Sequence, residues 1–87
     1  MPITRRQFDL GIDEKLEDWM RRIHSFLSAR RAEAFSESEL IAALGAQEKG
    51  LLFGDAVAKL AEIGAVETRK VGDAYYFVFK RDLPELR

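Results

Sequence analysis

Apolar residues recur in the first third of the chain with the spacing of an amphipathic helix. The i, i+3, i+4, i+7 positions are taken by Leu16, Trp19, Met20, Ile23, Phe26 and Leu27. Asp13 stands just before them as a candidate N-cap. The pattern therefore predicts a helix over residues 14–31, with acidic residues at its start and Arg30-Arg31 at its end, as the helix dipole prefers.

A capping box marks the start of a second helix. Ser36 and Glu39 are three residues apart, so that each side chain can bond the other's backbone amide. Phe35 before the cap and Leu40 at the fourth helical position form the matching hydrophobic staple. Gly45 can end this helix in a left-handed conformation.

A third helix over residues 51–63 is predicted by the spacing of Phe53, Val57 and Leu60. Residues 46–50 form the turn that leads into it. Gly54 costs about 1 kcal/mol relative to alanine inside a helix, so the first turn is expected to fray. The outward positions by the same spacing are Leu51, Gly54, Asp55, Ala58, Lys59 and Glu62.

Two runs of β-branched and aromatic residues follow, on either side of Gly72-Asp73. A two-residue turn with glycine first is the II′ type, which matches strand twist. It pairs Val71 with Ala74 and Val66 with Phe79, and so predicts a hairpin. One face of this hairpin is expected to lie against the helices, and it carries Val66, Thr68, Tyr75, Phe77 and Phe79. The other face carries Glu67, Arg69, Tyr76 and Val78.

The two ends of the chain carry weaker patterns. Phe8, Leu10 and Ile12 alternate with polar residues, which indicates a short extended arm over residues 1–12 with one apolar face. Such an arm packs on its own domain or pairs with a second copy, and disorder up to about Gln7 is the alternative. Residues 81–87 are expected to form a polar tail.

The order helix, helix, helix, hairpin over residues 13–80 resembles the winged helix-turn-helix superfamily. The resemblance implies an α+β, mainly α domain in which three helices precede a C-terminal β-hairpin wing. It also implies DNA binding, with the third helix in the major groove and the wing on the backbone or minor groove. The expected function is then that of a small transcription regulator.

Charge limits how such a domain would hold DNA. The chain has 14 basic and 15 acidic residues, so phosphate binding, which supplies most nucleic-acid affinity, must come from local clustering. Asp55 and Glu62 would meet phosphate unfavourably on the third helix. We therefore expect the wing to make the main contact with DNA, with the third helix lying less deep in the groove. The candidate DNA-binding residues are Arg5, Arg6, Lys49, Lys59, Arg69 and Lys70. For Arg69, a cation–π pair with Tyr76 is the structural alternative.

A protein-interaction or dimerisation module without DNA binding is the competing interpretation. Apolar groups occupy positions where a DNA binder needs polar ones, and adjoining exposed apolar residues commonly mark partner surfaces. The candidate partner surface consists of Leu51, Leu52, Tyr76 and Val78. The same surface, or the N-terminal arm, could build a homodimer.

Catalytic chemistry finds no support in the residue types. The chain has no cysteine, and its one histidine, His24, falls beside the buried stripe of the first helix, where a partly exposed structural role is expected. Neither a metal site, a cofactor site, a catalytic triad nor a phosphate-binding glycine loop is indicated. No apolar run approaches the roughly 20 residues that span a bilayer, and no signal-peptide core is visible. We expect a non-enzymatic cytoplasmic protein with no membrane or small-molecule partner.

Overall fold

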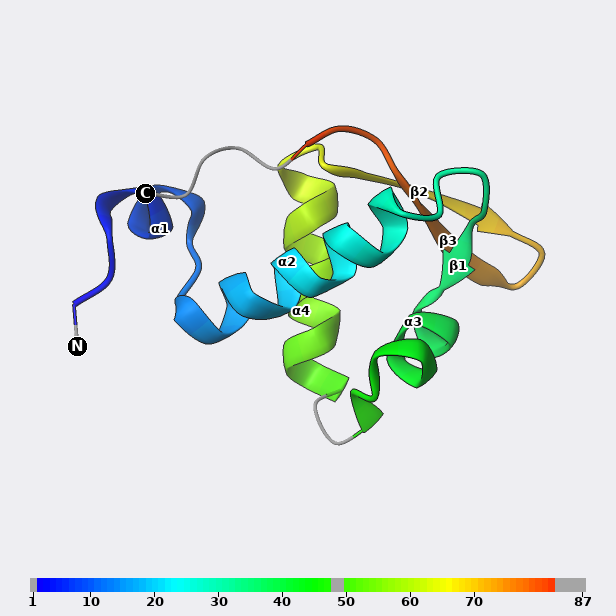
Figure 1. Ribbon diagram of the computed structural model, residues 1–87, viewed down its shortest axis with the longest axis horizontal. Helices are drawn as coiled ribbons and strands as arrows, with labels where there is room; N and C mark the ends of the chain where they lie inside the picture. The colour runs from blue at the N-terminus through cyan, green and yellow to red at the C-terminus, as the bar shows by residue number, and fades with distance from the viewer. Residues whose placement is uncertain (1, 48–49, 83–87) are drawn as a thin grey trace.

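The computed structural model describes residues 2–47 and 50–82, and within them the chain is an α+β domain of four helices and a three-stranded antiparallel sheet (Figure 1). In chain order the elements are α1 (Arg5–Leu10), α2 (Glu14–Ser28), β1 (Phe35–Ser36), α3 (Glu37–Leu44), α4 (Gly50–Glu62), β2 (Val66–Val71) and β3 (Ala74–Phe79). Within the described ranges, no helix combines the length and the apolar character needed to cross a membrane.

The long helix α2 starts as predicted and ends earlier. The Asp13 carboxylate accepts a 2.8 Å hydrogen bond from the Leu16 amide, which caps the helix. The helix stops at Ser28 instead of residue 31. Arg30 and Arg31 have left it, and their guanidinium groups lie over the rings of Phe26 and Phe79, at 4.0 and 4.2 Å from the ring centroids.

Helix α3 has the start and end that its capping signals predict. The Ser36 amide donates to the Glu39 carboxylate at 2.8 Å, and the Glu39 amide donates to the Ser36 hydroxyl at 3.3 Å. Gly45 ends the helix with φ +66°, in the left-handed region that favours glycine. Both predictions are confirmed.

A short strand that the sequence did not indicate lies just before α3. Phe35 pairs with Phe77, and Ser36 pairs with Tyr76, so β1 adds a third strand in the order β1-β3-β2. The Phe35 ring also meets the Phe26 ring edge-on, with the ring centroids 5.0 Å apart. This pairing ties the beginning of α3 to the sheet.

Helix α4 crosses α2 and supplies the centre of the core (Figure 1). Its fully buried residues include Phe53, Ala56 and Leu60. The Phe53 ring meets the Trp19 ring edge-on, with the ring centroids 5.8 Å apart. The predicted helix over residues 51–63 is thus confirmed, with bounds one residue earlier at each end.

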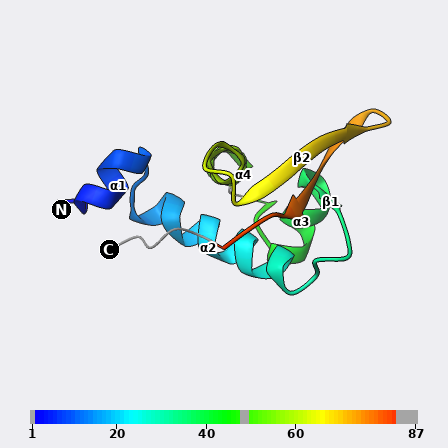
Figure 2. The ribbon, with the colours of Figure 1, turned by 90° about the horizontal axis from the view of Figure 1, so that it is seen from above.

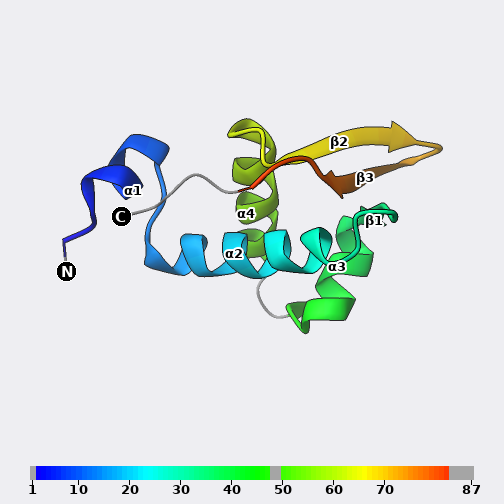
Figure 3. The same cartoon turned by 45° about the horizontal axis from the view of Figure 1, so that its top comes forward.

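The hairpin has the predicted register throughout. Val66 pairs with Phe79 and Val71 with Ala74, and Gly72 takes φ +68° at the turn. Val66 and Phe77 are buried against the helices. Thr68 and Tyr75 were also expected on that buried face, but Thr68 is exposed and Tyr75 is 59% exposed. The tip of the hairpin projects beyond the helices (Figure 3), so that the helices do not cover this face along its full length.

The predicted extended arm is wrong, because residues 5–10 form the helix α1. Thr4 and Gln7 make a second capping box, and Gly11 ends the helix with φ +72°. Gln7 is buried and donates a 2.6 Å hydrogen bond to Glu17 of α2. Ile12 is also buried, so this segment packs on its own domain.

Candidate functional site

The outward face of α4 carries no side chain suited to reading base edges. Leu51 is 90% exposed, and Asp55, Ala58 and Glu62 continue along the same exposed face. Direct readout in the major groove needs donors such as arginine, lysine, asparagine or glutamine. This face offers two apolar side chains and two carboxylates in their place.

Lys59 is the one cation that was predicted to point outward from α4, but its side chain lies along the helix surface and is mostly covered. Its ammonium group pairs with Glu62 at 2.8 Å, and its side chain is only 22% exposed. The Nζ atom lies 3.4 Å from the position that a Cβ would take at Gly11, so Lys59 extends over the link between α1 and α2.

Arg69 on the hairpin is also paired. Its guanidinium group donates a 2.9 Å hydrogen bond to the Glu67 carboxylate, two residues away on the same strand. This hydrogen bond, together with the positive charge of Arg69, holds the pKa of Glu67 below its usual value of 4.5. The charge of Arg69 is therefore balanced at neutral pH, and its partner is Glu67, not the ring of Tyr76. Lys70 beside it is exposed and has no ion pair with a described residue.

The remaining predicted cations lie far from the hairpin. Arg5 pairs with Asp9 at 3.0 Å on α1, and Arg6 is exposed. Helix α1 and the hairpin tip occupy opposite ends of the molecule when it is seen from above (Figure 2). Lys49 lies outside the described residues. Among the predicted DNA-binding residues that the structure describes, the cations of α1 therefore do not join those of the hairpin.

A groove of about 590 Å³ opens where α3, α4 and the hairpin meet, and we call it the α4–hairpin groove. Its floor is formed by Gly54, Val57, Ala58 and Ala61 of α4. The hairpin contributes Thr68, Tyr75 and Phe77, and the start of α3 contributes Ser36, Glu37 and Ser38. Most of this lining is apolar with a few polar groups at the rim, as is typical of binding sites of about 300–1,000 Å³.

Acidic groups stand at the helical rim of this groove. A Glu37 carboxylate oxygen lies 4.0 Å from the position that a Cβ would take at Gly54, so Glu37 reaches across to α4. Asp55 is exposed on the next position of α4. Neither carboxylate makes an ion pair with a residue that the structure describes. The groove therefore combines an apolar floor with uncompensated negative charge at one side.

The residues of the predicted partner surface do not share one pocket. Tyr76 and Val78 are half-buried on the other face of the sheet, where they line a small pocket of 200 Å³ with Val71 and the Glu67–Arg69 pair. Leu51 and Leu52 do not line that pocket, and Leu52 is half-buried. The sequence interpretation missed Tyr75, which it had assigned to the covered face. The position of Tyr75 close to the hairpin turn was the feature that could have indicated its exposure, because the helices do not reach the strand there.

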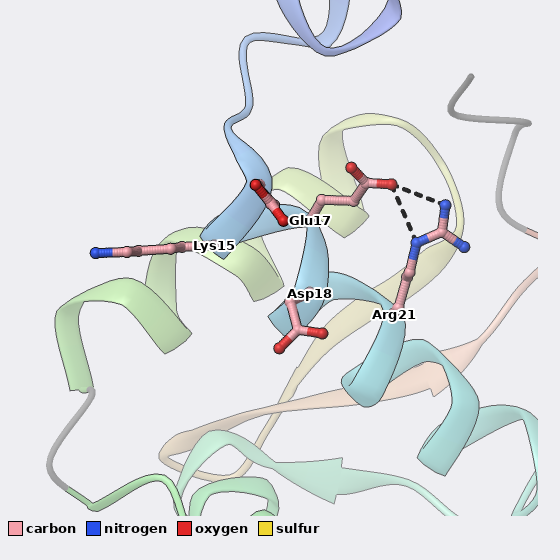
Figure 4. Close-up of a pocket in the computed structure, with 5 residues that line it drawn as sticks. Lys15, Glu17, Asp18 and Arg21 are labelled. Atoms are coloured by element: carbon pink, nitrogen blue, oxygen red, sulfur yellow. Dashed lines mark hydrogen bonds and ion pairs between the residues drawn. The ribbon is translucent and has the colours of Figure 1, made fainter. Parts of the chain in front are cut away.

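A second hollow runs along the first half of α2 (Figure 4). Charged residues of both signs line it: Glu14, Lys15, Glu17, Asp18 and Arg21. Arg21 donates two hydrogen bonds to Glu17, at 3.0 and 2.8 Å. Because this lining comes from one helix and its charges largely compensate, we regard the hollow as a solvated helix face.

His24 is a buried structural residue, more covered than expected. Its Nε2 atom lies 2.8 Å from the Arg81 carbonyl oxygen, and its ring lies 5.2 Å from the Phe79 ring. These contacts fix the end of β3 against α2. Among residues 2–47 and 50–82, no cluster of three or more histidine, cysteine or acidic side chains is arranged to hold a metal ion.

Comparison with protein-family models, with curated proteins and with solved structures finds no match to this chain.

Proposed function

We propose that this chain is a winged-helix domain that acts through protein–protein contact, with the α4–hairpin groove as its contact surface. The order of elements from α2 to β3, with a short strand before α3 and a closing hairpin, supports the winged-helix assignment. The observation that carries the functional proposal is Tyr75, an aromatic side chain that is 59% exposed at the open edge of an apolar groove.

Two further observations favour protein over nucleic acid as the partner of this surface. Phosphate contacts need uncompensated cations, whereas Lys59 and Arg69 are each paired with a carboxylate. The one charged residue that lines the groove is Glu37, whose carboxylate repels phosphate. Tyrosine is enriched at protein interfaces, where its ring supplies contact area and its hydroxyl a polar group.

Site-specific photo-crosslinking tests the proposal. Tyr75 or Val71 is replaced by photoreactive benzoylphenylalanine in cells that express the chain. The two side chains are equally exposed, at 59% and 60%, but only Tyr75 lines the groove. We expect protein adducts from position 75 and few from position 71. Equal yields from both positions, or adducts to nucleic acid from position 75, would overturn the proposal.

Weak binding of the DNA backbone through the wing is the second candidate, and exposed Lys70 is the observation that favours it. Glu67→Gln would release Arg69 beside it. If the wing touches phosphate, this variant should bind duplex DNA more tightly, and the salt dependence should steepen by about one charge. Fluorescence anisotropy at low salt measures both effects.

The matched control for that measurement is Asp18→Asn, which releases Arg22 from its 3.1 Å ion pair on α2. Arg22 lies outside the wing, so this variant should leave DNA affinity unchanged. If the unmodified protein and Glu67→Gln both fail to bind duplex at low salt, the DNA candidate is removed.

A further inference from the structure

Helix α1 presents an exposed apolar surface at the opposite end of the molecule from the groove. Phe8 is 69% exposed and Ile3 is 47% exposed. Phe8 is the fourth residue of the helix, and Ile3 comes just before the Thr4 cap. Side chains at these two positions commonly pack against each other across the first turn of a helix. Two large apolar side chains thus form one convex patch on a short helix, although Gln7 of the same helix is buried.

The charge of this segment is the opposite of the charge at the groove's helical rim. Residues 3–10 contain Arg5 and Arg6 against the single carboxylate of Asp9, and Arg6 has no ion pair with a described residue. The groove is lined by one carboxylate, that of Glu37, and by no cation among its lining residues. A convex apolar patch with excess positive charge therefore matches a concave apolar groove with excess negative charge.

The matching helix cannot come from the same molecule. Gln7 is bonded to Glu17 at 2.6 Å, and buried Ile12 fixes the link to α2. Helix α1 also lies at the end of the molecule opposite the hairpin tip (Figures 2 and 3). A second copy of the chain can supply the helix without any change of fold.

We propose that α1 of a second copy occupies the α4–hairpin groove, with Phe8 and Ile3 on the apolar floor and Arg6 beside Glu37. This inference rests on the proposed function and names the partner of the same surface. One six-residue helix in a groove buries less area than a standard interface of roughly 1,200–2,000 Å², so self-association should be weak.

Sedimentation equilibrium of the purified full chain, from about 10 µM to 1 mM, tests this proposal. We expect the average mass to rise above 9.9 kDa with concentration. Phe8→Ser should weaken association about tenfold, because it removes the central apolar contact. Val71→Ser is the matched control, since Val71 is 60% exposed against 69% for Phe8 but lies outside both α1 and the groove, and it should change nothing.

A charge exchange makes the test specific. Arg6→Glu and Glu37→Arg should each weaken self-association, and mixing the two variants should restore it in part, because the altered helix then meets the altered groove. Circular dichroism of Glu37→Arg checks that α3, whose first residue is Glu37, still forms. A folded chain that stays monomeric at about 1 mM, or association that Phe8→Ser leaves unchanged, would overturn the proposal.

The two proposals fail in different ways. Crosslinking from position 75 of the purified protein should give an adduct between two copies of the chain. If the purified protein gives no such adduct but position 75 still crosslinks another protein in cells, the second copy is wrong and the protein-contact function stands. If position 75 yields no protein adduct in either setting, both proposals are wrong.

Discussion

Single residues decide how the charges and the core of this domain are arranged. Lys59 and Arg69 are two of the cations that were expected to bind DNA, and each is paired with a neighbouring carboxylate. Exposed ion pairs contribute little stability, typically 0 to about 1 kcal/mol, so their importance here is that they neutralise the surface. Stability comes from buried apolar residues, with Phe53 at their centre.

Phe53→Ala should lower the free energy of unfolding by about 3–5 kcal/mol, because it removes a fully buried ring that contacts Trp19 and leaves a cavity. Leu51→Ala is the matched control on the same helix. Leu51 is 90% exposed, so its loss should change stability by no more than about 0.5 kcal/mol. Urea denaturation measures both, and equal effects of the two substitutions would contradict the placement of α4.

At the scale of elements, local signals predicted most of the fold. The capping box at Ser36, the cap at Asp13 and the turn at Gly72 act within a few residues, so that α2, α3 and the hairpin register could be predicted from the sequence. Strand β1 could not be predicted, because it consists of two residues whose partners lie some 40 positions later in the chain.

Helix α1 was missed for a different reason. Phe8, Leu10 and Ile12 alternate as in a strand, but Phe8 is exposed and Ile12 is buried, so that they share no face. The informative signal was Thr4 with Gln7 three residues later, a capping box of the kind already recognised at Ser36.

Thr4→Ala therefore tests what holds α1. Loss of the cap should destabilise this helix by about 1 kcal/mol, which corresponds to roughly fivefold faster hydrogen exchange at the amides of residues 8–11. Thr68→Ala, at an exposed position of β2, should leave these amides unchanged. If Thr4→Ala has no effect on α1 exchange, then packing of Gln7 and Ile12, and not the cap, sets the stability of the helix.

The candidate site depends on the whole molecule, and here the sequence was least informative. Whether Tyr75 is covered depends on how far the helices extend beneath the hairpin, and the direction of Lys59 depends on which carboxylate it meets, here that of Glu62. Neither can be read from spacing along the chain. The molecule extends 41 Å along its longest axis, with α1 near one end and the hairpin tip near the other, so that the predicted cations of these two elements lie apart (Figure 2).

We propose that the apolar α4–hairpin groove, and not a basic patch, is the surface through which the domain contacts its partner. The measurement that tests this proposal is the ratio of protein crosslinks formed in cells from position 75 to those formed from position 71. We expect a ratio well above one, with adducts to protein. A ratio near one, or nucleic acid as the main product from position 75, would rule the proposal out.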